Sequence, residues 1–119
     1  MNLLSSIVYS TGNSAEYDYR LPSLGTRYTN LAIKQSQSNI AHNECDYFGW
    51  EGSTVLCWVN QDNNGQLTPT SSFKRTGNIL MYYDNNIAKS YWGWKVNMGL
   101  KTSSDTWHQC DVHGFFTPF

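Results

Sequence analysis

Hydrophobic and polar residues alternate with a period of two over several short stretches of the chain. Tyr17, Tyr19 and Leu21 fall on one side of an extended backbone, and the charged residues that alternate with them fall on the other. Residues 54–59 are apolar on both sides, as expected of a strand in the middle of a sheet. Helical spacing is confined to residues 33–43, whose Ser, Gln and Asn content disfavours a helix. The pattern therefore predicts β-strands throughout.

The longest alternation runs through residues 92–100. Its apolar side consists of Trp92, Trp94, Val96, Met98 and Leu100. Because the two tryptophans share a side with three other apolar residues, this pattern favours the core for both, although Trp92, like Trp50 and Trp107, stays a candidate for exposure. We expect Trp58 to lie in the core as well, since it belongs to the stretch that is apolar on both sides.

Turn-forming residues separate the predicted strands at short intervals. Residues 45–50 and 53–61 are expected to form a hairpin that turns at Glu51 and Gly52. The Asn-Gly pair at 64–65 marks a second hairpin, because it accepts the positive φ of a type I′ turn. The fold class we expect is all-β: a single antiparallel β-sandwich or barrel-like domain of about seven to nine short strands, over residues 1–119.

Uncharged polar and aromatic residues replace charged ones in the composition. Charged residues make up 14% of the chain, against about 25% in a typical soluble domain, and eight Tyr and five Trp accompany many Asn, Ser, Thr and Gln. This composition is common in secreted proteins that bind sugars or surfaces, so we expect a secreted, extracellular protein. The net charge is −1 and the Lys and Arg residues are scattered, which disfavours nucleic acid as a partner.

The spacing of two cysteines predicts a disulfide. Cys45 and Cys57 lie at equal distances from Glu51, the middle of the first expected turn. In a hairpin they would face each other at a distance that a disulfide can span, and the bridge would stabilise the fold by roughly 3 kcal/mol. Cys110 would be free or would pair with one of the two. The alternative is three reduced, buried thiols that act as small hydrophobic residues.

Histidine and cysteine side chains are the candidate metal ligands. They are His42, Cys45, His108, Cys110 and His113. These donors suit zinc, but their spacing is not that of a zinc motif. Residues 62–66 carry alternating oxygen ligands, but they lack the closing acidic ligand of a calcium loop. We expect no metal and no cofactor.

Candidate catalytic groups are few. Glu44 and Asp46 flank Cys45 and resemble the carboxylate pair of glycoside hydrolases, although a solvated strand face explains them equally well. Cys110 has histidines nearby, but no third orienting group or oxyanion turn accompanies it. We therefore assign no catalytic residue and expect a protein that is not an enzyme.

Aromatic and amide side chains near the predicted turns are the best candidates for a binding site. Sugar-binding proteins stack exposed Trp and Tyr rings on pyranose rings, while Asn, Asp and Gln hydrogen-bond the hydroxyl groups. The predicted ligand-binding residues are Trp50, Tyr82, Tyr83, Asp84, Asn85, Asn86 and Tyr91. They favour a non-enzymatic module that recognises carbohydrate or a cell-surface polymer.

Two segments carry a resemblance to a group of known proteins. Residues 94–100 (WKVNMGL) and residues 112–118 (VHGFFTP) resemble the end of small secreted β-rich proteins of Gram-positive bacteria. In that group a strand bearing Lys and Asn precedes a final Gly-aromatic-x-Pro segment. The resemblance implies secretion and β structure, and the group has no assigned function. Its members commonly lack the cysteines of this chain.

An alternative function follows from the apolar end of the chain. Residues 114–119 (GFFTPF) are unusually apolar for a secreted protein. They fit a small toxin or bacteriocin-like protein acting on a target membrane or envelope, since aromatic residues favour the boundary between water and lipid. The same residues could instead complete the core as a last strand, so both readings stay open.

Overall fold

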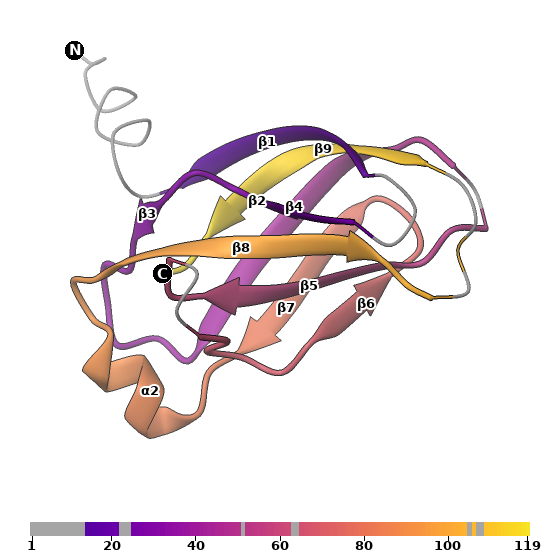
Figure 1. Ribbon diagram of the computed structural model, residues 1–119. Helices are drawn as coiled ribbons and strands as arrows, with labels where there is room; N and C mark the ends of the chain where they lie inside the picture. Colours follow the sequence, from indigo (N-terminus) through magenta and orange to yellow (C-terminus); the bar gives the residue numbers. More distant parts are fainter. Residues whose placement is uncertain (1–13, 22–24, 51, 63–64, 105, 107–108) are drawn as a thin grey trace, which may run out of the picture.

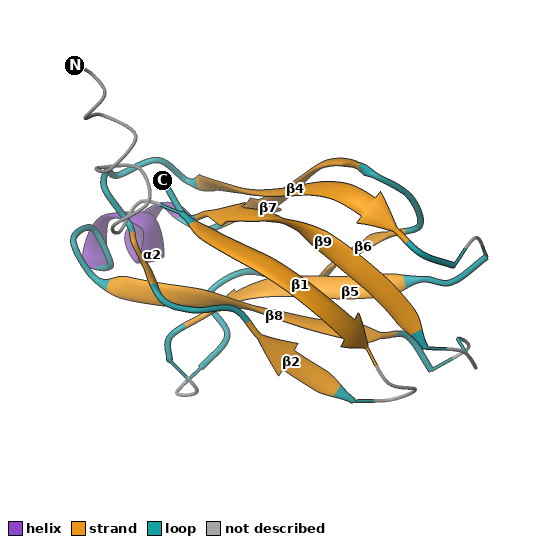
Figure 2. Cartoon of the chain, turned by 90° about the horizontal axis from the view of Figure 1, so that it is seen from above, coloured by secondary structure: helices purple, strands orange, loops and turns teal. Residues whose placement is uncertain are grey.

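Two antiparallel sheets pack face to face in the structure, a computed structural model that describes residues 14–21, 25–50, 52–62, 65–104, 106 and 109–119 (Figures 1 and 2). The first sheet contains, in spatial order, β1 (Ala15–Leu21), β9 (Cys110–Thr117), β4 (Ile40–Phe48) and β7 (Gly77–Tyr82). The second contains β2 (Thr26–Tyr28), β8 (Lys95–Thr102), β5 (Val55–Asn60) and β6 (Ser71–Phe73), with β3 (Ala32–Ile33) paired to β8 beside β2. The described residues thus form nine strands, and the predicted all-β sandwich is confirmed.

The alternating residues of the strands fill the space between the sheets. On β1, Tyr17 and Leu21 are buried and Tyr19 is half-buried, as the alternation predicts. Opposite them, β8 buries Val96, Met98 and Leu100 completely. The remaining fully buried apolar side chains of the core come from both sheets: Ala41, Val55, Cys57, Val59, Met81, Cys110, Val112 and Phe116.

The chain crosses from one sheet to the other between β4 and β5. The predicted hairpin of residues 45–50 and 53–61 is therefore wrong, because β4 pairs with β7 and β9 while β5 pairs with β6 and β8. The predicted Cys45–Cys57 disulfide is also wrong, since it depended on that hairpin, and both thiols are free and buried, as is Cys110. Cys45 Sγ donates to the Tyr47 carbonyl oxygen at 3.2 Å, and Cys57 Sγ accepts from Asn43 Nδ2 at 3.6 Å.

The second predicted hairpin lies between β5 and β6. Gln61 N donates to the Gly65 oxygen at 2.8 Å, and Asn60 pairs with Gln66, so the chain reverses here. Of the residues predicted to make the turn, 63 and 64 lie outside the described residues.

Trp92 and Trp94 are not in the core, which corrects the placement that the alternation favours. Each side chain is 51% exposed, because β8 begins only at Lys95 and the preceding residues form a turn with Gly93 at φ +89°. Trp58 is buried, as predicted, but on the outer side of the second sheet, where it covers Gly99.

A short helix, α2 (Asn85–Ser90), follows β7 where the sequence predicts only a turn. Asp84 caps it: one carboxylate oxygen accepts from Ile87 N at 2.8 Å, which satisfies a backbone donor of the first turn. The half-buried Ile87 and the buried Ala88 turn toward the core. The helix closes one end of the sandwich, near the end of β9 (Figures 1 and 2). No helix in the described part of the chain is long and apolar enough to cross a membrane.

Candidate functional site

Six of the seven predicted ligand-binding residues gather at the end of the sandwich that carries α2. Tyr82 ends β7, residues 83–86 lead into and begin the helix, and Tyr91 follows its last turn. Trp50 does not join them, because it follows β4 at the opposite end of the first sheet. There it borders a separate hollow of about 330 Å³, together with Arg20 and Asp111.

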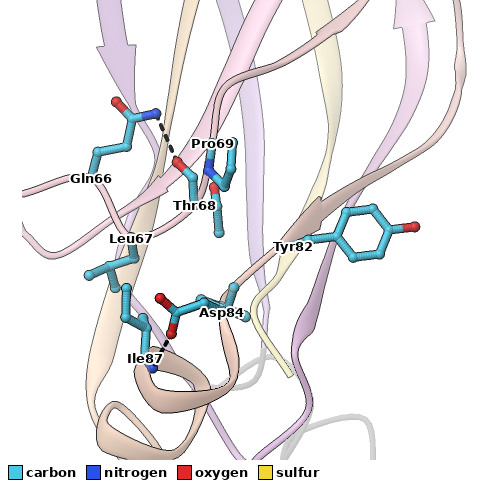
Figure 3. Close-up of a pocket in the computed structure, with 8 residues that line it drawn as sticks. Gln66, Leu67, Thr68, Pro69, Tyr82, Asp84 and Ile87 are labelled. Atoms are coloured by element: carbon cyan, nitrogen blue, oxygen red, sulfur yellow. Dashed lines mark hydrogen bonds between the residues drawn. The ribbon is translucent and has the colours of Figure 1, made fainter.

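A shallow pocket of about 540 Å³ lies beside the start of α2 (Figure 3). Its lining comes from the segment after β5 and from the end of β7 with α2: Gln66, Leu67, Thr68, Pro69, Tyr82, Tyr83, Asp84 and Ile87. The volume falls in the range of roughly 300–1,000 Å³ that is common for small-molecule sites. The sequence offered Gln66 only as a candidate calcium ligand and did not single out residues 67–69. These residues reach the pocket only because the chain folds back after β5.

The pocket has an apolar wall and an exposed aromatic ring beside it. Leu67, Pro69 and Ile87 supply aliphatic surface. The ring of Tyr82 is 52% exposed and points away from the other labelled residues, so it lies on the surface next to the pocket (Figure 3). An exposed ring in this position offers a face for stacking on the surface beside the pocket.

Oxygen atoms provide the polar character of the pocket. Asp84 uses one carboxylate oxygen for the helix cap, and the other faces the pocket (Figure 3). Gln66 Nε2 donates to the Thr68 carbonyl oxygen at 2.8 Å and to Thr70 Oγ1 at 2.9 Å, which fixes the amide and leaves its Oε1 as an acceptor. Thr68 Oγ1 accepts from Val59 N at 3.0 Å, so its hydroxyl hydrogen remains a donor. The pocket can therefore hydrogen-bond a hydroxyl-rich ligand.

Tyr83 is an anchor beneath this site. It is 2% exposed, and its hydroxyl donates to the Pro118 carbonyl oxygen at 3.0 Å. Burial raises the pKa of the Tyr83 hydroxyl above its usual value. The Lys34 ammonium lies 4.7 Å from the centre of the Tyr83 ring. The structure thus places Tyr83 where it positions Tyr82 and Asp84, away from the surface expected from the sequence.

Aromatic residues also surround the C-terminal end of α2. The Tyr91 hydroxyl donates to Gln61 Oε1 at 3.0 Å, and the Tyr91 ring meets the Trp94 ring edge-on at 5.3 Å. Trp92 Nε1 donates to the Gln35 carbonyl oxygen at 3.0 Å. Trp92 was a candidate for exposure from the sequence, whereas Trp94 was expected in the core, although Gly93 between them was a signal for a turn.

A different polar cluster lies on the outer face of the first sheet. His113 on β9 bonds Glu16 on β1 through Nε2 at 2.8 Å and Asp46 on β4 through Nδ1. Because the two carboxylates contact opposite sides of the imidazole ring, the three groups do not converge on one point. Among the described residues no three His, Cys, Asp or Glu side chains are arranged to hold a metal ion, and the candidate ligand His108 lies outside those residues.

The chain matches no protein-family model. A search of curated proteins likewise finds no similar sequence.

Proposed function

We propose that this protein is a secreted, non-enzymatic binding module that recognises carbohydrate, as a polysaccharide of a cell surface, through the α2 end of the sandwich. The observation that carries the proposal is the exposed Tyr82 ring on the surface next to a pocket lined by Asp84, Gln66 and Thr68. Pyranose rings present an apolar C–H face and a ring of hydroxyl groups. A stacking ring beside fixed oxygen acceptors and a hydroxyl donor matches both.

The rigidity of the site supports this function. Asp84 is held by the helix cap and the Gln66 amide by two hydrogen bonds, while Tyr83 ties the end of β7 to Pro118. Side chains that are already ordered lose little conformational freedom when a ligand binds. The site therefore suits a weakly interacting, flexible ligand such as a sugar chain.

The alternative of a membrane-active toxin has lost its main support. The apolar segment at the end of the chain forms β9, which lies between β1 and β4 in the first sheet. Phe116 is fully buried there and belongs to the core, whereas Phe115 and Phe119 are 37% and 42% exposed. Inserting the strand itself into lipid would require the sheet to open. The carbohydrate-binding function accounts for the exposed aromatic residues without such a change.

The test is a screen of the purified protein on an array of glycans and bacterial cell-wall fragments. We expect specific binding that Tyr82→Ala weakens about tenfold, the loss of about 1.4 kcal/mol of stacking. Tyr47→Ala is the matched control, because Tyr47 is 54% exposed but lies at the other end of β4. Trp50→Ala tests the one predicted binding residue that lies at the opposite end of the sandwich.

Circular dichroism of each variant establishes that the fold is kept. Absence of binding by the folded wild-type protein would overturn the proposal. Equal losses for the Tyr82 and Tyr47 variants would overturn the location of the site.

A further inference from the structure

Two tryptophans form an exposed turn at the C-terminal end of α2, on the side of the helix away from the pocket. Trp92 and Trp94 are each 51% exposed and flank Gly93, whose φ of +89° produces the turn. Backbone bonds hold the turn against β3: Gly93 N donates to the Lys34 oxygen at 2.7 Å, and Lys34 N donates to the Trp94 oxygen at 2.9 Å. The turn is thus a fixed part of the fold.

Both indole rings are also held in place. Trp92 donates its ring N–H to the Gln35 carbonyl oxygen, and Trp94 packs edge-on against Tyr91. Tyr91 is in turn held by Gln61, whose Oε1 accepts from the Tyr91 hydroxyl. Among the contacts of the described residues, Gln61 Nε2 therefore remains a donor. Leaving half of each large apolar ring in water costs free energy that burial would recover. Rigid, half-exposed rings beside amide groups are the same combination that the pocket offers at the other end of the helix.

The exposed side of α2 connects these two regions. It carries Asn85, Asn86, Lys89 and Ser90, all of them exposed polar residues. A helix of six residues is about 9 Å long, at a rise of about 1.5 Å per residue. A single sugar cannot contact the aromatic groups at both ends of such a helix, whereas an oligosaccharide can.

We propose that the Trp92–Trp94 turn is a second stacking subsite for the polysaccharide, so that the ligand is an extended chain that passes along α2 from the Tyr82 pocket. This inference rests on the proposed function. It gives the amide groups of Asn85 and Asn86 a role between the two subsites, as hydrogen-bonding partners for the middle of the chain.

An anionic lipid surface is the competing ligand for exposed tryptophans. Polybasic recognition of such a surface uses clusters of about four to eight cations. The segment from α2 to the start of β8 provides only Lys89 and Lys95. The groups that contact the rings are the Gln35 carbonyl oxygen and Tyr91, and the Gln61 amide bonds Tyr91; such polar groups suit hydroxyl groups better than acyl chains.

The experiment measures how affinity depends on the length of the sugar chain. The probes are β-linked oligosaccharides with flat pyranose faces, two and six units long (chitobiose and chitohexaose, cellobiose and cellohexaose), titrated calorimetrically. We expect the wild-type protein to bind the six-unit sugar of one series at least tenfold more tightly than its two-unit counterpart. Trp94→Ala and Trp92→Ala should each reduce that advantage severalfold and leave the two-unit affinity unchanged, whereas Tyr82→Ala should weaken both.

Two further variants and one further probe complete the design. Trp94→Phe keeps an aromatic face and should retain most of the length advantage. Trp50→Ala removes an indole of similar exposure (46%) at the other end of the sandwich and should change neither affinity. Melting temperatures report whether each variant remains folded. Vesicles that contain phosphatidylglycerol test the lipid alternative.

The two proposals fail in different ways. Equal affinity for the two lengths, or a Trp94→Ala variant that loses both affinities equally, would overturn the second subsite and leave carbohydrate binding intact. Absence of any sugar binding would overturn both proposals. Vesicle binding that depends on Trp94, without any length-dependent sugar binding, would assign the turn to lipid and overturn the inference.

Discussion

His113 and Glu16 connect two neighbouring strands of the first sheet through a direct contact of 2.8 Å between Nε2 and Oε2. The other imidazole nitrogen bonds Asp46 on β4, so one side chain links β1, β9 and β4 on the solvent-exposed face of the sheet. The Glu16 and Asp46 carboxylates only accept hydrogen bonds when they are ionised. Both hydrogen bonds therefore form only when His113 is protonated on both nitrogens. Hydrogen bonds to Asp46 and then to Glu16 raise the pKa of His113 from 6.5 to about 8.

The stability that His113 provides should depend on pH. Because the pKa is raised in the folded protein, the contribution is fully present below pH 6.5 and is lost as the pH rises through about 8. We expect His113→Gln to lower the urea midpoint more at pH 6 than at pH 9. An Asp46→Asn variant should show a smaller pH dependence of the same sign. A His113→Gln effect that is equal at the two pH values would contradict this account.

Two glycines in the strands leave room for neighbouring groups. A Cβ atom at Gly99 would overlap the Trp58 ring, and one at Gly114 would overlap the Glu44 carbonyl oxygen. A ring can shift, whereas a backbone in a sheet cannot, so Gly114→Ala should destabilise the protein more than Gly99→Ala. We expect Gly99→Ala to lower the free energy of unfolding by about 2 kcal/mol. Gly65→Ala is the control, because a Cβ there meets nothing within 4 Å. Denaturant unfolding measures all three, and the reverse order would refute the packing argument.

The strands were largely predictable because their pattern is local. Alternation in β1 and in the Val96–Leu100 part of β8 depends on which residues face the core, and both were found correctly. Which strands pair was not predictable, because β4 and β5 are adjacent in sequence but belong to different sheets. The disulfide prediction failed for that reason, since it required Cys45 and Cys57 to be cross-strand neighbours.

Six of the seven residues predicted to bind ligand lie close together, but their local structure was misread from the sequence. The polar turn after β7 identified Asp84, but the helix that it caps is too short to show a periodic pattern. Trp92 and Trp94 precede the first residue of β8, Lys95, but continue its alternating pattern. The period of the sequence alone therefore favoured the core for both. Residues 66–69 carry no local signal, because only the folding of the chain brings them beside Asp84.

The three thiols should be protected from reagents in the folded protein. All three are free and buried, and burial raises the pKa of Cys57 to about 12, so the reactive thiolate is scarce at pH 8. We expect almost no reaction with Ellman's reagent in buffer and three equivalents in concentrated guanidinium chloride without reductant. One equivalent in the denatured protein would reveal a disulfide and contradict the structure.

Asp84 should contribute to stability as the cap of α2, separately from any role in binding. Asp84→Ala removes the acceptor for Ile87 N and should cost about 1 kcal/mol of unfolding free energy. Asp84→Asn keeps a capping oxygen, so its stability should remain close to that of the wild type. If the carboxylate also contacts sugar, the Asn variant should bind more weakly while staying stable. Equal stability of the Ala and wild-type proteins would show that the cap is unimportant.

Lys34 is a buried cation whose hydrogen bonds join the end of the chain to the loop before β4. Its side chain is inaccessible to solvent, and Nζ donates to the carbonyl oxygens of Ser36 and Ser38, both at 2.7 Å, and of Phe119 at 3.2 Å. Burial lowers the pKa of Lys34. These three bonds and the Tyr83 ring replace the water that the ammonium group loses on folding.

Replacing Lys34 with methionine should therefore destabilise the protein, although methionine has a similar length and is more apolar. The substitution leaves the acceptors of Ser36, Ser38 and Phe119 without their donor, and we expect a loss of about 3 kcal/mol in denaturant unfolding. Lys95→Met is the matched control, because Lys95 is exposed at the start of β8 and should change stability by less than about 0.5 kcal/mol. The near-ultraviolet circular dichroism of the Lys34 variant should also change, since Tyr83 loses the ammonium group above its ring. A Lys34→Met protein as stable as the Lys95 variant would show that the buried ammonium group contributes nothing to holding this end of the sandwich together.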